Sequence, residues 1–233
     1  MVRANVYRDE PRLRLQRFID AFFEDSHLDT VLDAGAGRTL PLDVPGNAHL
    51  VALDVSLDEL ARNENADEKI VGDLQSADLC GRIFDLIICW DVLEHLTKPE
   101  AAVSRMATWL RPGGALVVGV PNLWSTKGII TKLTPYSFHK WVYRRLFGVR
   151  GSTPFRTYLR VSITPHNLAQ HAAEHRLKLV YSETYAGGAE EKLPRALYVI
   201  LSASSGIVRA ATGGSFDPSF SEHVAVFEKL ADA

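Results

Sequence analysis

Apolar runs of strand length recur along the first half of the chain, at residues 30–34, 49–55, 69–72, 84–90 and 115–121. One amphipathic stretch precedes the first apolar run, and another lies between the last two. Residues 11–25 and 99–110 place their apolar side chains at helical spacing, and the second stretch ends in Arg-Pro-Gly-Gly, a helix stop with a tight turn. This alternation predicts right-handed βαβ units and a parallel sheet covered by helices on both faces.

The alternation stops after Asn122 and resumes with a helix expected over residues 164–176. Two further apolar runs follow, at 177–185 and 196–204, with a Gly-Gly stretch between them and no helical pattern. Consecutive strands without a helix favour a hairpin, so we expect the last strand to run antiparallel. Residues 205–221 are small and glycine-rich and are expected to form a loop, and residues 221–231 a short final helix.

The composition indicates an ordinary globular chain. Its 233 residues, 46% hydrophobic and 23% charged, favour one domain over residues 1–233. The two cysteines, Cys80 and Cys89, lack metal-type spacing, which predicts buried reduced thiols and no metal site. The first twenty residues are too charged for a signal peptide and no apolar run approaches a membrane span, so we expect a soluble, cytoplasmic protein.

Charge is distributed unevenly along this chain. Residues 101–173 contain no Asp or Glu but ten of the 26 Lys and Arg residues, although the whole chain carries a net charge of only -2. Eight of these ten cations lie in residues 122–163, interleaved with aromatic side chains. The pattern predicts either a solvated basic face or a surface for an anionic partner.

The most specific chemistry lies where the apolar runs end. The first run leads into Asp33-Ala34-Gly35-Ala36-Gly37, which indicates a buried strand opening into a tight turn that a ligand can approach closely. The next two runs carry Asp54 and Asp73 at or just after their ends. Acidic residues at the ends of neighbouring strands predict a ligand lying along one edge of a parallel sheet.

The order of elements and three motifs resemble the class I S-adenosylmethionine-dependent methyltransferases of the small-molecule branch. The motifs are the glycine turn, the run at 84–90 continued by Asp-Val-Leu-Glu-His, and Leu-Arg-Pro-Gly-Gly at 110–114 followed by a strand. The resemblance covers residues 31–202. It implies an α/β, three-layer Rossmann-like fold with a seven-stranded, mostly parallel sheet, the last strand antiparallel, and a helical lid inserted at about 122–163.

The resemblance also implies S-adenosyl-L-methionine as cofactor and a role for several residues. Gly35 and Gly37 would let the loop pass under the methionine part and the ribose. Asp33 would act as the anionic partner of the cofactor's amino group. Asp54, together with Val55, would bind the ribose hydroxyls.

Asp73 and the backbone of Leu74 would bind the adenine edge, and Trp90 would lie along the cofactor near the sulfonium. One position departs from the family pattern, because Thr39 stands where a third glycine is often found. Simpler interpretations stay open: Asp54 and Asp73 are also suitable as cap or turn residues, and Trp90 as a core residue.

Methyl transfer from a sulfonium is an in-line displacement that needs alignment, exclusion of water and, for an oxygen or amine nucleophile, a base. It requires no metal. Histidine is suited to act as the base at neutral pH. The candidate catalytic residues are His95, His139 and His166, each of which could instead be a surface or capping residue.

Residues 122–163 are expected to form a lid of one or two helices over the acceptor. A small-molecule acceptor is favoured, with O-methylation of a sugar, glycan-pathway or secondary-metabolite hydroxyl as the first hypothesis. N-methylation, or a lipid-linked or quinone-like acceptor reached by peripheral membrane contact, is the alternative. Nucleic acid is disfavoured, because the Asn/Asp-Pro-Pro-Tyr tetrad and the Pro-Cys nucleophile are absent.

Two other function classes compete with a methyltransferase. An NAD-dependent dehydrogenase would also use an acidic residue such as Asp54, but its Gly-x-Gly-x-x-Gly fingerprint is incomplete here and no Tyr-x-x-x-Lys pair follows. The second competing class is a non-catalytic nucleotide-binding module with the same fold. The sequence does not predict an oligomeric state.

Overall fold

The computed structural model describes residues 2–3, 10–125, 157–158, 160–186, 205–207, 209–211 and 217–231, and the structural statements below concern these ranges. Most of the expected lid, including His139, lies outside the described residues, as does the apolar run at 196–204.

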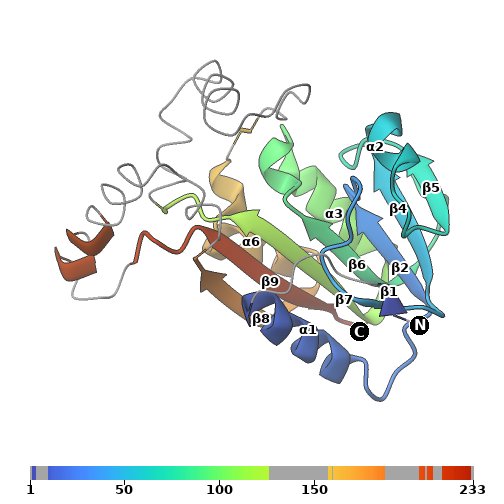
Figure 1. Cartoon of the computed structure of the whole chain (residues 1–233), viewed down its shortest axis with the longest axis horizontal. Helices are drawn as coiled ribbons and strands as arrows, with labels where there is room; N and C mark the ends of the chain where they lie inside the picture. Colours follow the sequence, from blue (N-terminus) through green and yellow to red (C-terminus); the bar gives the residue numbers. More distant parts are fainter. Residues whose placement is uncertain are drawn as a thin grey trace.

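A seven-stranded sheet forms the centre of the molecule (Figure 1). In spatial order its strands are β5 (Glu68–Val71), β4 (His49–Asp54), β2 (Thr30–Ala34), β6 (Phe84–Trp90), β7 (Leu110–Pro121), β9 (Glu222–Lys229) and β8 (Leu177–Tyr185). β9 is antiparallel to both of its neighbours, and the other paired strands run parallel. The predicted fold class is confirmed, and the boundaries of β2, β6 and β8 match the apolar runs.

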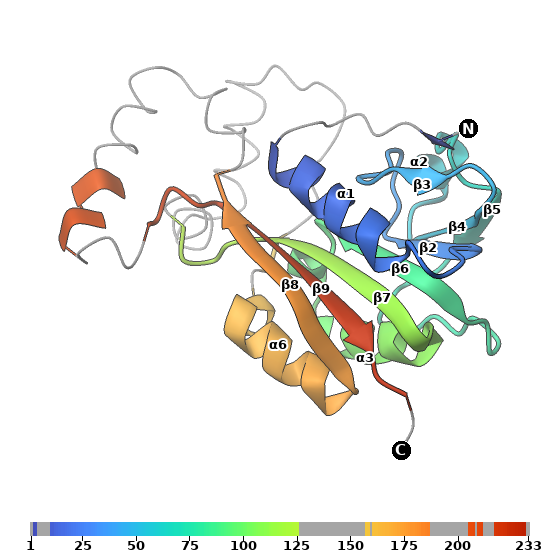
Figure 2. The same cartoon turned by 90° about the horizontal axis from the view of Figure 1, so that it is seen from below.

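Helices cover the sheet on both faces (Figure 2). On one face α3 (Pro99–Trp109) and α6 (Pro165–Glu174) contribute Val103, Met106 and Leu168 to the larger core cluster. On the other face α1 (Glu10–Phe22) buries Leu15 and Ile19 in a second cluster. Successive buried side chains of β2, β4, β6 and β7 mostly alternate between these two clusters, which fixes the register of each strand.

Shorter elements complete the described chain. α2 (Leu57–Ala61) follows β4, η1 (Leu93–His95) follows β6, and η2 (Val161–Ile163) precedes α6. β1 (Val2–Arg3) pairs antiparallel with β3 (Val44–Pro45). Among the described residues, no helix is long and apolar enough to span a membrane.

The expected final helix at residues 221–231 is wrong, because residues 222–229 form β9. Five consecutive residues of this strand, from His223 to Phe227, are buried between β7 and β8. A short, fully buried strand shows a continuous apolar run, and its periodicity does not distinguish it from a helix. The antiparallel last strand was predicted, but it is this segment that supplies it.

The Arg-Pro-Gly-Gly motif ends α3 as expected but belongs to the start of β7, which begins at Leu110 directly after the helix. Gly113 adopts a φ of +74°, and a Cβ on Gly114 would lie 2.8 Å from the carbonyl oxygen of Asp85. The Arg111 guanidinium forms an ion pair with the Asp85 carboxylate. This motif therefore joins β7 closely to β6 and takes no direct part in lining the cavity described next.

Candidate active site

A cavity of about 310 Å³ lies where β2, β4, β5 and β6 end. Its volume falls in the range of small-molecule and cofactor pockets. Carboxyl ends of parallel strands are the usual place for such a pocket in an α/β fold. The residues that line it are Gly35, Gly37, Leu53, Asp54, Val55, Glu59, Gly72, Asp73, Leu74, Gln75, Asp91, Val92, His95 and Leu96.

The two glycines after β2 serve different purposes. Both have positive φ, +80° at Gly35 and +49° at Gly37, which L side chains rarely adopt. A Cβ on Gly35 would lie 2.2 Å from Cγ2 of Val92, so this glycine is needed for packing within the protein. A Cβ on Gly37 would meet no described atom within 4 Å. The open space at Gly37 is therefore available to a ligand.

The Asp54 carboxylate is fixed by the loop around it. Its Oδ2 accepts a hydrogen bond from the Gly37 N–H at 2.9 Å, and its Oδ1 accepts one from the Ser56 N–H at 2.7 Å. A carboxylate has about four acceptor sites. The two oxygens can thus still accept from two hydroxyl groups of a ligand while the backbone holds them in place.

The wall after β5 is attached to the start of α3. Exposed Asp73 accepts a hydrogen bond from the Gln75 N–H at 2.8 Å, and Gln75 Oε1 accepts one from the Lys98 N–H at 2.8 Å. Arg105 donates to the carbonyl oxygens of Gln75 and Ala77, at 2.9 and 2.8 Å. These contacts connect the loop that carries Asp73 to α3 and position Asp73 in the cavity wall.

Asp33 is buried and is not among the residues that line the cavity. The residue is 3% exposed, and among the described residues its Oδ2 has no hydrogen-bond partner. Burial, and secondarily the nearby charge of Asp54, raises the pKa of Asp33 to about 8. A buried carboxyl group without a partner favours a cationic ligand group close by.

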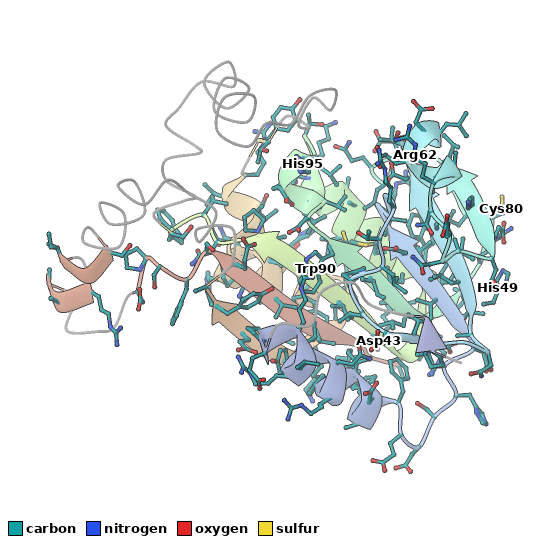
Figure 3. The ribbon with its side chains drawn as sticks, viewed as in Figure 1. Asp43, His49, Arg62, Cys80, Trp90 and His95 are labelled. Atoms are coloured by element: carbon teal, nitrogen blue, oxygen red, sulfur yellow. The ribbon has the colours of Figure 1, made fainter. Side chains whose placement is uncertain are left out.

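Trp90 does not line the cavity either. Its ring packs under Gly119, where a Cβ would lie 2.6 Å from Cδ2 of the indole, and it joins the core cluster on the α1 face (Figure 3). The Arg12 guanidinium from α1 lies 4.8 Å from the ring centre. The core interpretation of Trp90 accounts for these contacts, and a contact with a cofactor stays a prediction.

The three candidate histidines have different locations. Partly buried His95 lines the cavity, and its Nε2 lies 3.8 Å from Oε1 of buried Glu94 (Figure 3). His166 is exposed in the first turn of α6 and is not among the cavity residues. His139 lies outside the described residues. Of the three, the structure places His95 beside the predicted cofactor residues.

Sequence reasoning missed part of the lining. Asp91 and Val92 directly follow the end of β6, and Gln75 lies four residues after the end of β5, so their positions near strand ends could have indicated them. Asp91 also has a φ of +55°, a strained conformation for a residue other than glycine. Glu59 enters from α2, and no motif in the sequence signals its position.

Comparisons with known proteins identify the family of this chain. Residues 7–174 match the family model described as a methyltransferase domain. An uncharacterised protein of Methanocaldococcus jannaschii is 30% identical over 100 residues, which is 43% of this chain and 44% of that protein, so the match spans less than half of the curated relative's length.

Two solved structures share the fold. A SAM-dependent methyltransferase from Archaeoglobus fulgidus superposes with a TM-score of 0.56 at 15% identity, covering 94% of this chain and 93% of that one. The N-methyltransferase NodS from Bradyrhizobium japonicum, solved with S-adenosyl-L-homocysteine, has a TM-score of 0.51 at 16% identity, covering 94% and 87%. The chain belongs to the methyltransferase domain family, and its resemblance to the class I S-adenosylmethionine-dependent enzymes is confirmed.

Proposed function

We propose that this protein transfers the methyl group of S-adenosylmethionine to a small-molecule acceptor, most simply to a hydroxyl oxygen of a sugar, glycan-pathway or secondary-metabolite compound. The observation that carries this function is the arrangement of the strand ends. Gly37, Asp54 and Asp73 come from three neighbouring strands and line one cavity.

The residues present fit this cofactor. Gly37 leaves open space at the turn, where a ligand can approach the main chain, and Asp54 offers an oriented carboxylate to vicinal hydroxyls. Oδ2 of the buried Asp33 carboxyl group has no hydrogen-bond partner among the described residues, which suits a cationic ammonium group nearby. When bound, the cofactor supplies an electrophilic methyl carbon attached to a good leaving group.

The protein's own task is then alignment and proton removal. Asp54 and Asp73 are separated by one strand-to-strand step and are each fixed by backbone hydrogen bonds, so they can hold the nucleoside without reorganising. His95 lies on the same cavity, with the buried Glu94 carboxylate beside it. We assign His95 as the base that removes the proton from the nucleophilic group of the methyl acceptor. This role needs an imidazole within hydrogen-bond reach of the nucleophile.

The position of the insertion supports a substrate-covering role for residues 122–163. At its start, Asn122 donates through Nδ2 to the Phe220 carbonyl at 2.8 Å. Near its end, the Tyr158 N–H donates to the Glu94 carbonyl at 2.7 Å, directly beside His95. The chain therefore returns from the insertion at the edge of the cavity, which supports the proposal that the insertion selects the acceptor.

N-methylation is the second candidate, since the structural relative NodS is named as an N-methyltransferase. The same base would serve an amine, so the geometry accommodates either nucleophile. The basic and aromatic composition of the insertion also leaves an anionic or lipid-linked acceptor as a hypothesis.

Calorimetry of the purified protein with S-adenosylmethionine, S-adenosylhomocysteine and NAD tests the assignment. Saturable binding of the first two and none of NAD is expected, and Asp54→Asn is expected to weaken it. Binding of NAD but not of the other two ligands would contradict the proposal and indicate a dehydrogenase. An assay that follows transfer of an isotopically labelled methyl group to a panel of sugars, amines and quinols then identifies the acceptor. A Lys140→Glu, Arg144→Glu variant tests the basic insertion. If this variant loses methyl transfer but keeps its cofactor affinity, the insertion takes part in acceptor binding.

A further inference from the structure

The last turn of α6 carries a second group of side chains with chemistry of its own. His171, Glu174 and His175 follow an H-x-x-E-H spacing, and positions three and four apart share one face of a helix. One nitrogen or oxygen from each of the three residues lies within 4.8 Å of the other two. None of them lines the cavity described above.

His171 is oriented as a metal ligand would be. Its Nε2 lies 3.1 Å from the backbone carbonyl oxygen of Glu100 in the first turn of α3. A carbonyl oxygen only accepts, so Nε2 carries the hydrogen. Its Nδ1 lies 3.0 Å from Oε2 of Glu174. An imidazole that donates through one nitrogen to a backbone carbonyl, and directs the other towards a second ligand, has the arrangement typical of protein metal sites.

The two imidazoles and the carboxylate match a borderline transition-metal ion. Zn²⁺ binds histidine nitrogen and carboxylate oxygen at about 2.0–2.2 Å, so two tetrahedral ligand atoms are separated by about 3.3 Å. The 3.0 Å between the His171 and Glu174 atoms is close to this separation. The His175 ring lies edge-on to that of His171, with centroids 4.9 Å apart, and its ligand nitrogen lies within 4.8 Å of the other two ligand atoms.

The surroundings also favour a cation. The group lies at the C-terminal end of α6, where the helix dipole is negative. Side chains of His171 and Glu174 are 23% and 62% exposed, so an ion can enter from solvent. Lys229 opposes it weakly, as its ammonium donates to the His175 carbonyl at 3.0 Å.

We propose that His171, Glu174 and His175 form a Zn²⁺-binding site that is separate from the methyl-transfer cavity. Three protein ligands leave the fourth position to water. The ion ties the last turn of α6 together, and the hydrogen bond from His171 to Glu100 extends this connection to the start of α3. The site does not depend on the proposed function.

Titration of the full-length protein with Zn²⁺ in competition with a chromophoric chelator tests the site. The experiment is best done in a Cys80→Ser background. The prediction that both cysteines are buried is wrong for Cys80, which is an exposed thiol able to bind zinc on its own, whereas Cys89 is buried. We expect one equivalent to bind, and His175→Ala and Glu174→Gln to weaken binding at least tenfold. His166→Ala, a matched change of an exposed histidine on the same helix, should leave the affinity unchanged.

A thermal melt separates metal binding from a general effect on folding. Zn²⁺ should raise the Tm of the parent and of His166→Ala but not that of His175→Ala, while Mg²⁺, which prefers oxygen ligands, should change none of them. His171→Ala also removes the contact with Glu100, so the two other variants carry the test. Equal Zn²⁺ affinity in the parent and in His175→Ala, or no stoichiometric binding by the parent, would overturn the proposal.

Discussion

Replacing Asp33 by asparagine should stabilise the ligand-free protein at neutral pH and change how its stability depends on pH. The carboxyl group is fully buried, lies near Asp54, and has a pKa raised to about 8 by these surroundings. In the unfolded chain the same group ionises near its ordinary value of 3.8. Between these two values the folded state holds one more proton than the unfolded state, so stability falls as the pH rises.

The size of the effect follows from proton linkage. Each pH unit between the two pKa values costs about 1.4 kcal/mol, so the parent should lose about 3 kcal/mol from pH 5 to pH 7.5 through Asp33 alone. The amide introduced by Asp33→Asn does not titrate and avoids this loss, although an unpaired buried amide costs about 1–3 kcal/mol at every pH. Other titrating groups, such as buried His223, are common to both proteins and cancel in the difference.

Urea unfolding of the parent and Asp33→Asn at several pH values between 5 and 7.5 measures this difference directly. The variant should gain on the parent as the pH rises, and it should also bind S-adenosylmethionine more weakly if the carboxylate partners the ammonium group. Parallel stability curves for the two proteins across this range would refute the reasoning, because they would show that Asp33 does not hold a proton in the folded state.

Three further predictions concern the cavity. Gly35→Ala should cost about 2–4 kcal/mol in chemical unfolding, from its positive φ and its contact with Val92, whereas Gly37→Ala should cost less than half as much and instead weaken cofactor binding in calorimetry. Equal loss of stability at the two glycines would contradict their separate roles. Asp54→Asn should weaken cofactor binding at least tenfold, since it removes the charge from an acceptor of hydroxyl hydrogen bonds; unchanged calorimetric affinity would remove Asp54 from the site. His95→Ala should lower kcat by about a hundredfold with cofactor affinity retained, and undiminished turnover in the methyl-transfer assay would assign the base elsewhere.

The sequence predicted the sheet well because its signals are local. The strands at 30–34 and 84–90 are almost continuous apolar runs, which are typical of parallel strands buried on both faces. β9 was missed for the same reason, since its short buried run has the same pattern as a buried helix, and only its position between β7 and β8 determines its structure. Tertiary pairing of this kind is not encoded in any window of the chain.

The site was predicted unevenly. Asp54 and Asp73 lie at or just after the carboxyl ends of parallel strands. Their positions in the sequence are therefore enough to predict that they line the cavity. Trp90 has the same location in sequence, but its side chain alternates to the α1 face and packs under Gly119. The alternation of side chains along a strand decides such cases, and it depends on which face each helix covers.

A crystal structure of the protein with S-adenosylhomocysteine is the most direct test that this cavity binds the cofactor. The adenosine should lie across the ends of β2, β4 and β5, with its ribose hydroxyls within hydrogen-bond distance of Asp54 and its adenine beside Asp73 and Leu74. A nucleoside bound elsewhere, or a cavity that stays closed to it while Asp54 bonds only to its own loop, would contradict the methyltransferase assignment of this site.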